Sequence, residues 1–251
     1  VSQAYWLLPQ VFFVFTQAKN VQLSHANLLS SPETYERNLQ FSNIKDISQL
    51  KSFWLEILDP DTSGKFNYLF YVWRTHLASP TIQAIGYALF ALVVIGLIYS
   101  LKKKIPTSHS VLGTSIVSLF FLLGGGVLIN NKIPLIGELF RSPFTKFSIV
   151  LSLGFSYFFS VACIFLLALF QTLHSKFTYY LTLFTVSAAL IVFATPVFTG
   201  NFISPNMRLK LPTEYLQLFD LFKNQDPSTR VATFPQFSLW GWNYYNWGYR
   251  G

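Results

Sequence analysis

The sequence predicts an all-α polytopic membrane protein with about five transmembrane helices, followed by the start of an α/β extracytoplasmic domain. Charged residues make up only 11% of the 251 residues, whereas soluble domains have roughly 25%. Aromatic residues make up 18%, which excludes a disordered chain. Four windows hold no Asp, Glu, Lys or Arg, and each exceeds the roughly 20 residues that cross a bilayer as a helix. These windows are Thr75–Leu101, Ile105–Asn131, Phe147–Ser175 and Phe177–Met207.

The chain divides into four parts. Residues 1–18 are expected to form a partial transmembrane helix, with Trp6 as an interfacial anchor. Residues 19–81 form a polar extracytoplasmic loop with short helices, residues 82–197 a four-helix transmembrane region, and residues 198–251 the start of a truncated extracytoplasmic domain. The segment before residue 19 has no start methionine and no signal-peptide pattern, so we expect an interior fragment of a longer protein.

The polar loop predicts two short helices. Ser31 before Pro32 and Glu33 is a typical helix start, because the hydroxyl caps free amides and proline fits the first helical position. A second helix is predicted over residues 47–58, where apolar residues recur at helical spacing. The run from Asp59 to Gly64 resembles the opening of a calcium loop, but position twelve is Phe70 where a glutamate is required. We therefore interpret it as a turn, with a metal or acid role as the alternative.

The four spans are predicted at residues 82–101, 110–130, 147–170 and 177–197. The connection with Lys102, Lys103 and Lys104 and the one with Lys176 together hold four basic residues and no acidic ones. The positive-inside rule places both connections in the cytoplasm, so residues 19–80, 131–146 and everything after 198 lie outside. We expect a multi-pass protein of the plasma membrane.

The segment between the second and third of these spans is the best candidate for a binding site. Ser142 can cap and Pro143 can start the next helix, so its positive dipole end faces outward, with Arg141 and Lys146 beside it. Two cations at a helix N-terminus suit the phosphate of a membrane lipid. The alternative is that both side chains extend to ordinary lipid headgroups without a specific site.

A family resemblance rests on several short motifs. Three glycines, Gly124 to Gly126, close one span; Ile133-Pro134 follows, and the run Phe140 to Phe147 opens the next span. Together with Trp6-Leu7-Leu8-Pro9, Ser48 to Trp54, Pro212 to Tyr215, Arg230-Val231 and Phe234-Pro235, these motifs resemble GT-C-type membrane glycosyltransferases. The nearest relatives are expected in the YfhO family and among arabinofuranosyltransferase-like membrane proteins.

The resemblance implies transfer of a sugar from a polyprenyl-phosphate-linked donor to a glycan acceptor on the outer face, in cell-envelope assembly. It also implies that an acidic catalytic residue lies in a first outer loop, before Val1. The catalytic residue is therefore unknown from this sequence. Arg141 and Lys146 become candidates for the donor phosphate. A polytopic transporter or flippase and a non-catalytic scaffold remain alternatives.

The C-terminal part predicts a helix from Pro212, with Tyr215, Leu218, Phe219 and Phe222 along one stripe, and a strand over Arg230–Phe234. Eight aromatic residues follow within residues 234–251. Trp240, Trp242 and Trp247 are candidates for stacking on sugar rings, and the alternative is a membrane-interface belt or a domain core.

No set of residues predicts a metal or a cofactor. The four histidines are far apart, and no phosphate loop, dinucleotide fingerprint or nucleophile elbow occurs. The positive charge is spread over both predicted faces of the membrane, which argues against nucleic acid as a partner. The single Cys163 excludes a disulfide within the chain.

Overall fold

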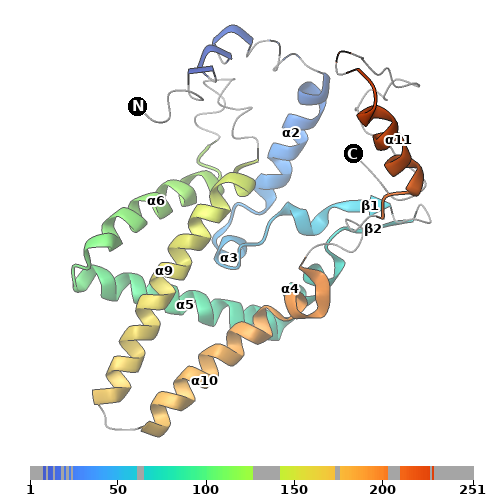
Figure 1. Cartoon of the computed structure of the whole chain (residues 1–251). Helices are drawn as coiled ribbons and strands as arrows, with labels where there is room; N and C mark the ends of the chain where they lie inside the picture. Colours follow the sequence, from blue (N-terminus) through green and yellow to red (C-terminus); the bar gives the residue numbers. More distant parts are fainter. Residues whose placement is uncertain are drawn as a thin grey trace.

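The computed structural model describes residues 8–9, 11–13, 15–17, 20, 23, 25–60, 65–126, 142–172, 176–202, 210–226 and 228. This part of the chain is mostly helical, with one small sheet (Figure 1). Its elements, in order, are α2 (His25–Gln40), α3 (Ile44–Ser48), the 3-10 helix η1 (Phe53–Glu56), β1 (Leu58–Pro60), β2 (Phe66–Tyr68), α4 (Tyr71–Ala78), α5 (Pro80–Lys102), α6 (Pro106–Leu122), α9 (Pro143–Thr172), α10 (Lys176–Phe193), the π-helical turn η2 (Val197–Asn201) and α11 (Thr213–Lys223).

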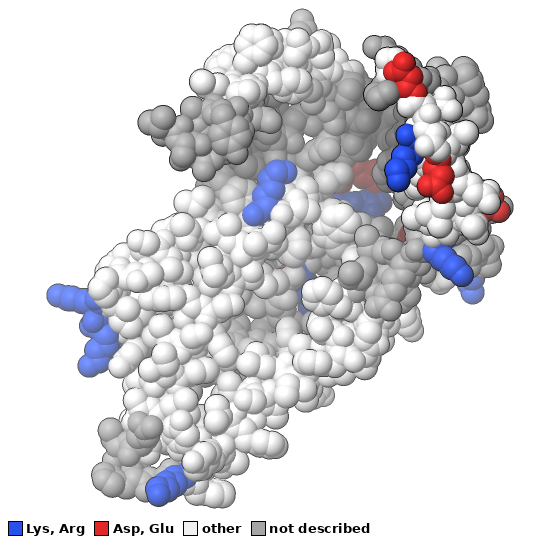
Figure 2. Space-filling view, viewed as in Figure 1, with Lys and Arg blue, Asp and Glu red and all other residues white. Residues whose placement is uncertain are grey.

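Three helical segments are long and apolar enough to cross a membrane. They are Pro80–Lys102, Pro143–Phe170 and Lys176–Asn201, which match three of the predicted spans. Only 22%, 17% and 6% of their respective apolar windows is buried inside the protein. A space-filling view shows a largely uncharged body, with basic residues at its left edge and lower tip and another over its upper middle (Figure 2). The protein is therefore suited to a membrane.

The prediction of about five spans is not confirmed. The helix α6 has 17 residues, or about 25 Å at 1.5 Å per residue, which is shorter than a hydrocarbon core of about 30 Å. It ends in a glycine turn, where Gly124 has a φ of 83°, its N–H donates to Phe121 O, and the Gly125 N–H donates to Phe120 O. This arrangement is the Schellman motif. Residues 127–130 of the predicted span lie outside the described residues, and residues 8–9, 11–13 and 15–17 are helical.

Glycines set the closest contacts between the long helices. At the crossing of α5 and α9, a β-carbon at Gly96 would collide with the Phe158 carbonyl and lie 3.0 Å from the Ala162 nitrogen. At the contact of α6 and α9, a β-carbon at Gly154 would collide with the Ser115 hydroxyl. Small residues thus let the helix backbones approach, as is common between membrane helices.

An apolar cluster joins the loop to the helices. Ile47 of α3, Leu122 of α6 and Leu151 of α9 are buried against one another, with Phe144 and Phe147 packed around them. The C-terminal end of α6 therefore lies at the same end of the bundle as α3, and Gly124 lies beside Leu39 of α2. The helix α6 thus returns to the end where α5 begins.

Two loop predictions were wrong. The helix expected to start at Ser31 starts at His25, so Pro32 lies inside α2. Proline there removes only one intrahelical hydrogen bond, and the residues before it still form helix. The helix expected over residues 47–58 is divided into α3, η1 and β1. Leu50 has a φ of 52°, in the left-handed region that a helix cannot include, and the Ser52 hydroxyl then accepts from the Trp54 N–H to begin η1.

The strands β1 and β2 form an antiparallel pair in which Pro60 lies opposite Phe66. This sheet was not predicted, and residues 61–64, where a turn was expected, lie outside the described residues. Arg74 of α4 lies 4.1 Å from the centre of the Tyr68 ring and binds the Glu56 carboxylate, so α4 is tied to both η1 and β2.

The helix α10 is followed by Pro196 and the turn η2, and this end is held by α4. Proline has no N–H, so it leaves the Val192 carbonyl without its helical donor, and the Thr195 hydroxyl donates to it at 2.8 Å. His76 Nε2 donates to the Phe193 carbonyl at 3.1 Å, and Trp73 Nε1 donates to the Asn201 carbonyl at 2.8 Å. The helix α11 begins after Pro212 as predicted, and its apolar residues, such as Phe219, are exposed.

Candidate functional site

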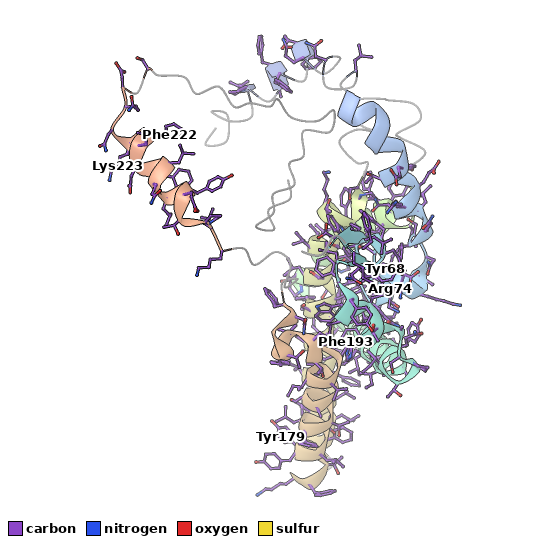
Figure 3. The ribbon with its side chains drawn as sticks, turned by 90° about the vertical axis from the view of Figure 1, so that its right-hand side faces the viewer. Tyr68, Arg74, Tyr179, Phe193, Phe222 and Lys223 are labelled. Carbon is purple, nitrogen blue, oxygen red and sulfur yellow. The ribbon has the colours of Figure 1, made fainter. Side chains whose placement is uncertain are left out.

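A groove lies between three helices and the loop after α3. Its cavity volume is about 250 Å³, slightly below the roughly 300–1,000 Å³ of typical ligand sites. The walls are mostly apolar and come from α5, α9 and α10, while the segment after α3 closes one end. The lining residues are Ser48, Gln49, Leu50, Gly86, Leu89, Phe90, Val93, Ser152, Phe155, Ser156, Phe159, Leu190 and Phe193. Phe193 marks the place of the groove in Figure 3, where the end of α10 meets the other helices.

Gln49 is a buried polar residue of this groove. It follows α3, and its side chain is only 7% exposed because it inserts against Gly86 of α5. Its Nε2 donates to the Gln83 carbonyl at 3.5 Å, whereas its Oε1 has no hydrogen-bond partner. An unpaired buried amide oxygen costs free energy, on the order of 1–3 kcal/mol. The groove therefore contains an acceptor that lacks a donor.

The three serine hydroxyls of the groove donate elsewhere. Ser48 donates to the Lys45 carbonyl, Ser152 to the Ile149 carbonyl and Ser156 to the Ser152 carbonyl, each at 2.8 Å. Each hydroxyl oxygen keeps lone pairs but has used its hydrogen. With Gln49 Oε1, the groove presents mainly acceptors, so it suits a ligand with hydroxyl or amide donors and does not suit a phosphate anion.

The predicted phosphate site lies at the N-terminus of α9. The helix begins at Pro143 as expected, and the Thr145 hydroxyl lies 2.9 Å from the Ser142 carbonyl and 3.4 Å from the Ser142 hydroxyl. Lys146 is exposed in the first turn, whereas Phe144 and Phe147 pack into the apolar cluster. Arg141 lies outside the described residues.

Lys146 and the groove lie on different faces of α9. With about 3.6 residues per turn, Lys146 shares a face with Leu153 and Ile164, whose side chains are 69% and 67% exposed. Ser152 and Phe159, which line the groove, lie on the opposite side of the helix. The structure therefore does not bring Lys146 and the groove together. Instead, Lys146 lies at the N-terminal end of a stripe of α9 whose apolar side chains, such as Leu153 and Ile164, face away from the protein.

The structure also shows a partly buried lysine, Lys51, that the sequence did not indicate as a candidate site residue. Lys51 borders a small cavity of about 10 Å³ with Asn38, Ser52 and Leu122, and its ammonium donates to the Leu77 carbonyl at 3.0 Å. Burial lowers the pKa of Lys51, and the nearby Asp46 carboxylate partly opposes this shift. Lys51 thus ties the segment after α3 to the end of α4.

The other candidate residues are not brought into a site. Trp240, Trp242, Trp247 and the predicted strand over Arg230–Phe234 lie outside the described residues. No group of three or more metal-ligating side chains occurs among the residues described. Sequence reasoning missed Gln49 and the groove, because Gln49, Gly86 and Phe193 are distant in the chain and no motif links them.

Comparisons of the chain with protein families, with curated proteins and with solved structures found no match.

Proposed function

We propose that the chain is part of an integral membrane glycosyltransferase of the GT-C type. In this proposal it uses a polyprenyl-phosphate-linked sugar donor on the outer face of the plasma membrane and serves the assembly of a cell-envelope glycan. The observation that carries the proposal is the position of Lys146, in the first turn of α9 and at the end of an outward apolar stripe. A lipid-linked donor joins a long hydrocarbon chain to a phosphate. The stripe and Lys146 offer surfaces for these two parts in the same order.

The helix terminus adds to the charge of Lys146. The first amides of a helix have no partner within it, and the helix dipole gives this end a partial positive charge. Both favour a phosphate group. In the proposal, Arg141 supplies the second cation, and Trp240, Trp242 and Trp247 contact the sugar.

The absence of charge within the spans favours this enzyme over a coupled transporter. Transporters usually carry ionisable residues near the middle of the membrane. The sequence has no Asp, Glu, Lys or Arg from residue 75 to 101, from 147 to 175 or from 177 to 207.

The test is binding of a polyprenyl-phosphate sugar to the full-length protein in lipid nanodiscs. Replacing Arg141 and Lys146 by Gln is expected to weaken binding about 100- to 10,000-fold, because charge-assisted hydrogen bonds contribute about 1.5–3 kcal/mol each and two of them are lost. Lys103→Gln, an exposed cation between α5 and α6, is the matched control and should bind like the unchanged protein.

Equal affinity of the double variant and the control, with both folded, would show that Arg141 and Lys146 only approach ordinary headgroups. A transfer assay with the same donor then separates an enzyme from a scaffold. A protein that binds the donor but transfers no sugar under any acceptor condition would refute the enzymatic part of the proposal.

A further inference from the structure

We propose that the groove between α5, α9 and α10 binds one hydrocarbon chain of a neutral lipid, and that a hydroxyl or amide N–H near the headgroup of this lipid donates to Gln49 Oε1. The inference does not rest on the proposed sugar transfer. It rests on the lining of the groove, on the unpaired oxygen and on the depth of Gln49 in the bundle.

The lining fits a hydrocarbon chain. The groove follows α5 from Gly86 to Val93, and α9 from Ser152 to Phe159, over about 10 Å of each helix. All three helices belong to segments that are able to cross a membrane, so the occupant that reaches the groove from the side is lipid. A chain of methylene groups buries apolar surface there without needing hydrogen bonds.

The unpaired oxygen specifies the other end of the ligand. Gln49 Oε1 is buried and accepts no hydrogen bond, while the nitrogen of the same amide is already bonded to the Gln83 carbonyl. An acceptor requires a donor, and the serine hydroxyls nearby have donated their hydrogens to their own backbone. A phosphate or an ester offers only acceptors here, whereas a glycerol hydroxyl or an amide N–H offers the missing donor.

The depth of Gln49 in the membrane agrees with a hydrogen bond from a lipid headgroup to its Oε1. Gly86, against which Gln49 packs, lies about 9 Å along α5 from Pro80, at about 1.5 Å per residue. The polar layer of a bilayer is about 5–8 Å thick on each side of a hydrocarbon core of about 30 Å. Gln49 thus lies near the boundary of the two regions when Pro80 is at the surface. Hydroxyl and amide groups of neutral lipids lie at this boundary.

The ligand pair monoolein and methyl oleate tests the donor directly. Both have the same hydrocarbon chain, but only monoolein has hydroxyl hydrogens. In nanodiscs that contain the full chain, monoolein is expected to bind about 3- to 10-fold more tightly, as one net hydrogen bond contributes about 0.5–1.5 kcal/mol. Gln49→Leu should remove this preference and leave methyl oleate binding unchanged. The control Gln83→Leu keeps its backbone carbonyl and should retain the preference.

A second pair of variants tests whether the lipid binds in the groove. Ser156 lines the groove, whereas Ser160 lies one turn further along α9, outside the lining, with the same type of hydrogen bond to its own helix. Ser156→Phe should fill the groove and weaken both lipids, and Ser160→Phe should weaken neither. Equal binding of the two lipids to the unchanged protein, or equal effects of the two phenylalanine variants, would overturn the proposal.

Photo-crosslinking of the unchanged protein provides a measurement that does not depend on the folding of any variant. Monoacylglycerol with a diazirine in its chain should label Phe90 and Phe159, which line the groove. Labelling confined to outward residues such as Leu153 and Ile164 would mean that the lipid only surrounds the protein, and the proposal would then be wrong.

Discussion

Among the glycines that the structure describes, Gly96 leaves the least room for a side chain, and substitution there is expected to have a large effect on stability. In Gly96→Ala, the new β-carbon would collide with the Phe158 carbonyl oxygen, and it would also lie 2.7 Å from the Phe158 carbonyl carbon. Carbon atoms in contact lie about 3.5–4.0 Å apart, so α5 and α9 must separate by about 1 Å. Overpacking of this kind costs about 1–3 kcal/mol, and the separation also weakens the other contacts along the crossing. We expect a loss of about 3 kcal/mol in the free energy of unfolding.

Gly113 provides a matched control within the same bundle. It lies inside α6, and a β-carbon there meets no atom within 4 Å. Gly113→Ala should therefore stabilise the protein by up to about 1 kcal/mol, because alanine restricts the backbone and favours helix. Denaturation of both variants in mixed detergent micelles, followed by circular dichroism, gives the two free energies. A Gly96→Ala protein as stable as Gly113→Ala would refute the packing of α5 on α9 described here.

Three further predictions concern the loop and the topology. His76→Ala should destabilise the protein by about 0.5–1.5 kcal/mol in the same denaturation assay, because the partly buried Phe193 carbonyl loses its donor, and His76→Gln should recover part of this loss. The lowered pKa of Lys51 means that the folded state loses this proton at a lower pH than the unfolded state does. The free energy of unfolding should therefore rise with pH between the lowered pKa and the ordinary value of 10.5. This rise should vanish in Lys51→Met. Cysteines at Lys103 and Asp59, in a background without other cysteines, should react with impermeant reagents from opposite sides of the membrane, and labelling from one side would contradict the predicted topology.

The long helices could be predicted from the sequence because their signal is local. The windows that became α5, α9 and α10 have no charge, and a helix is the form in which each can satisfy its own backbone in lipid. The start of α9 at Pro143 and the helix after Pro212 were also predicted correctly, since proline marks a helix start through its own geometry.

The errors occurred where distant contacts decide the local structure. The segment 47–58 has the apolar spacing of one helix, but Leu50 adopts a positive φ that interrupts it. Ile47 is therefore buried as part of α3, and Phe53 as part of η1. The span expected over residues 110–130 ends early because a glycine turn stops α6 after Leu122. For the phosphate site, the sequence places Lys146 correctly at a helix start, but only the structure shows that it faces away from the groove.

The hydrogen bonds from α4 to the end of α10 have a consequence for the order of assembly. The carbonyls of Phe193 and Asn201 accept from His76 and Trp73, which are 117 and 128 residues earlier in the chain. During synthesis from the N-terminus, α4 is made before any of the three long apolar helices. Its two donors are thus already present when α10 leaves the ribosome, so these two carbonyls have partners as soon as that helix reaches its neighbours.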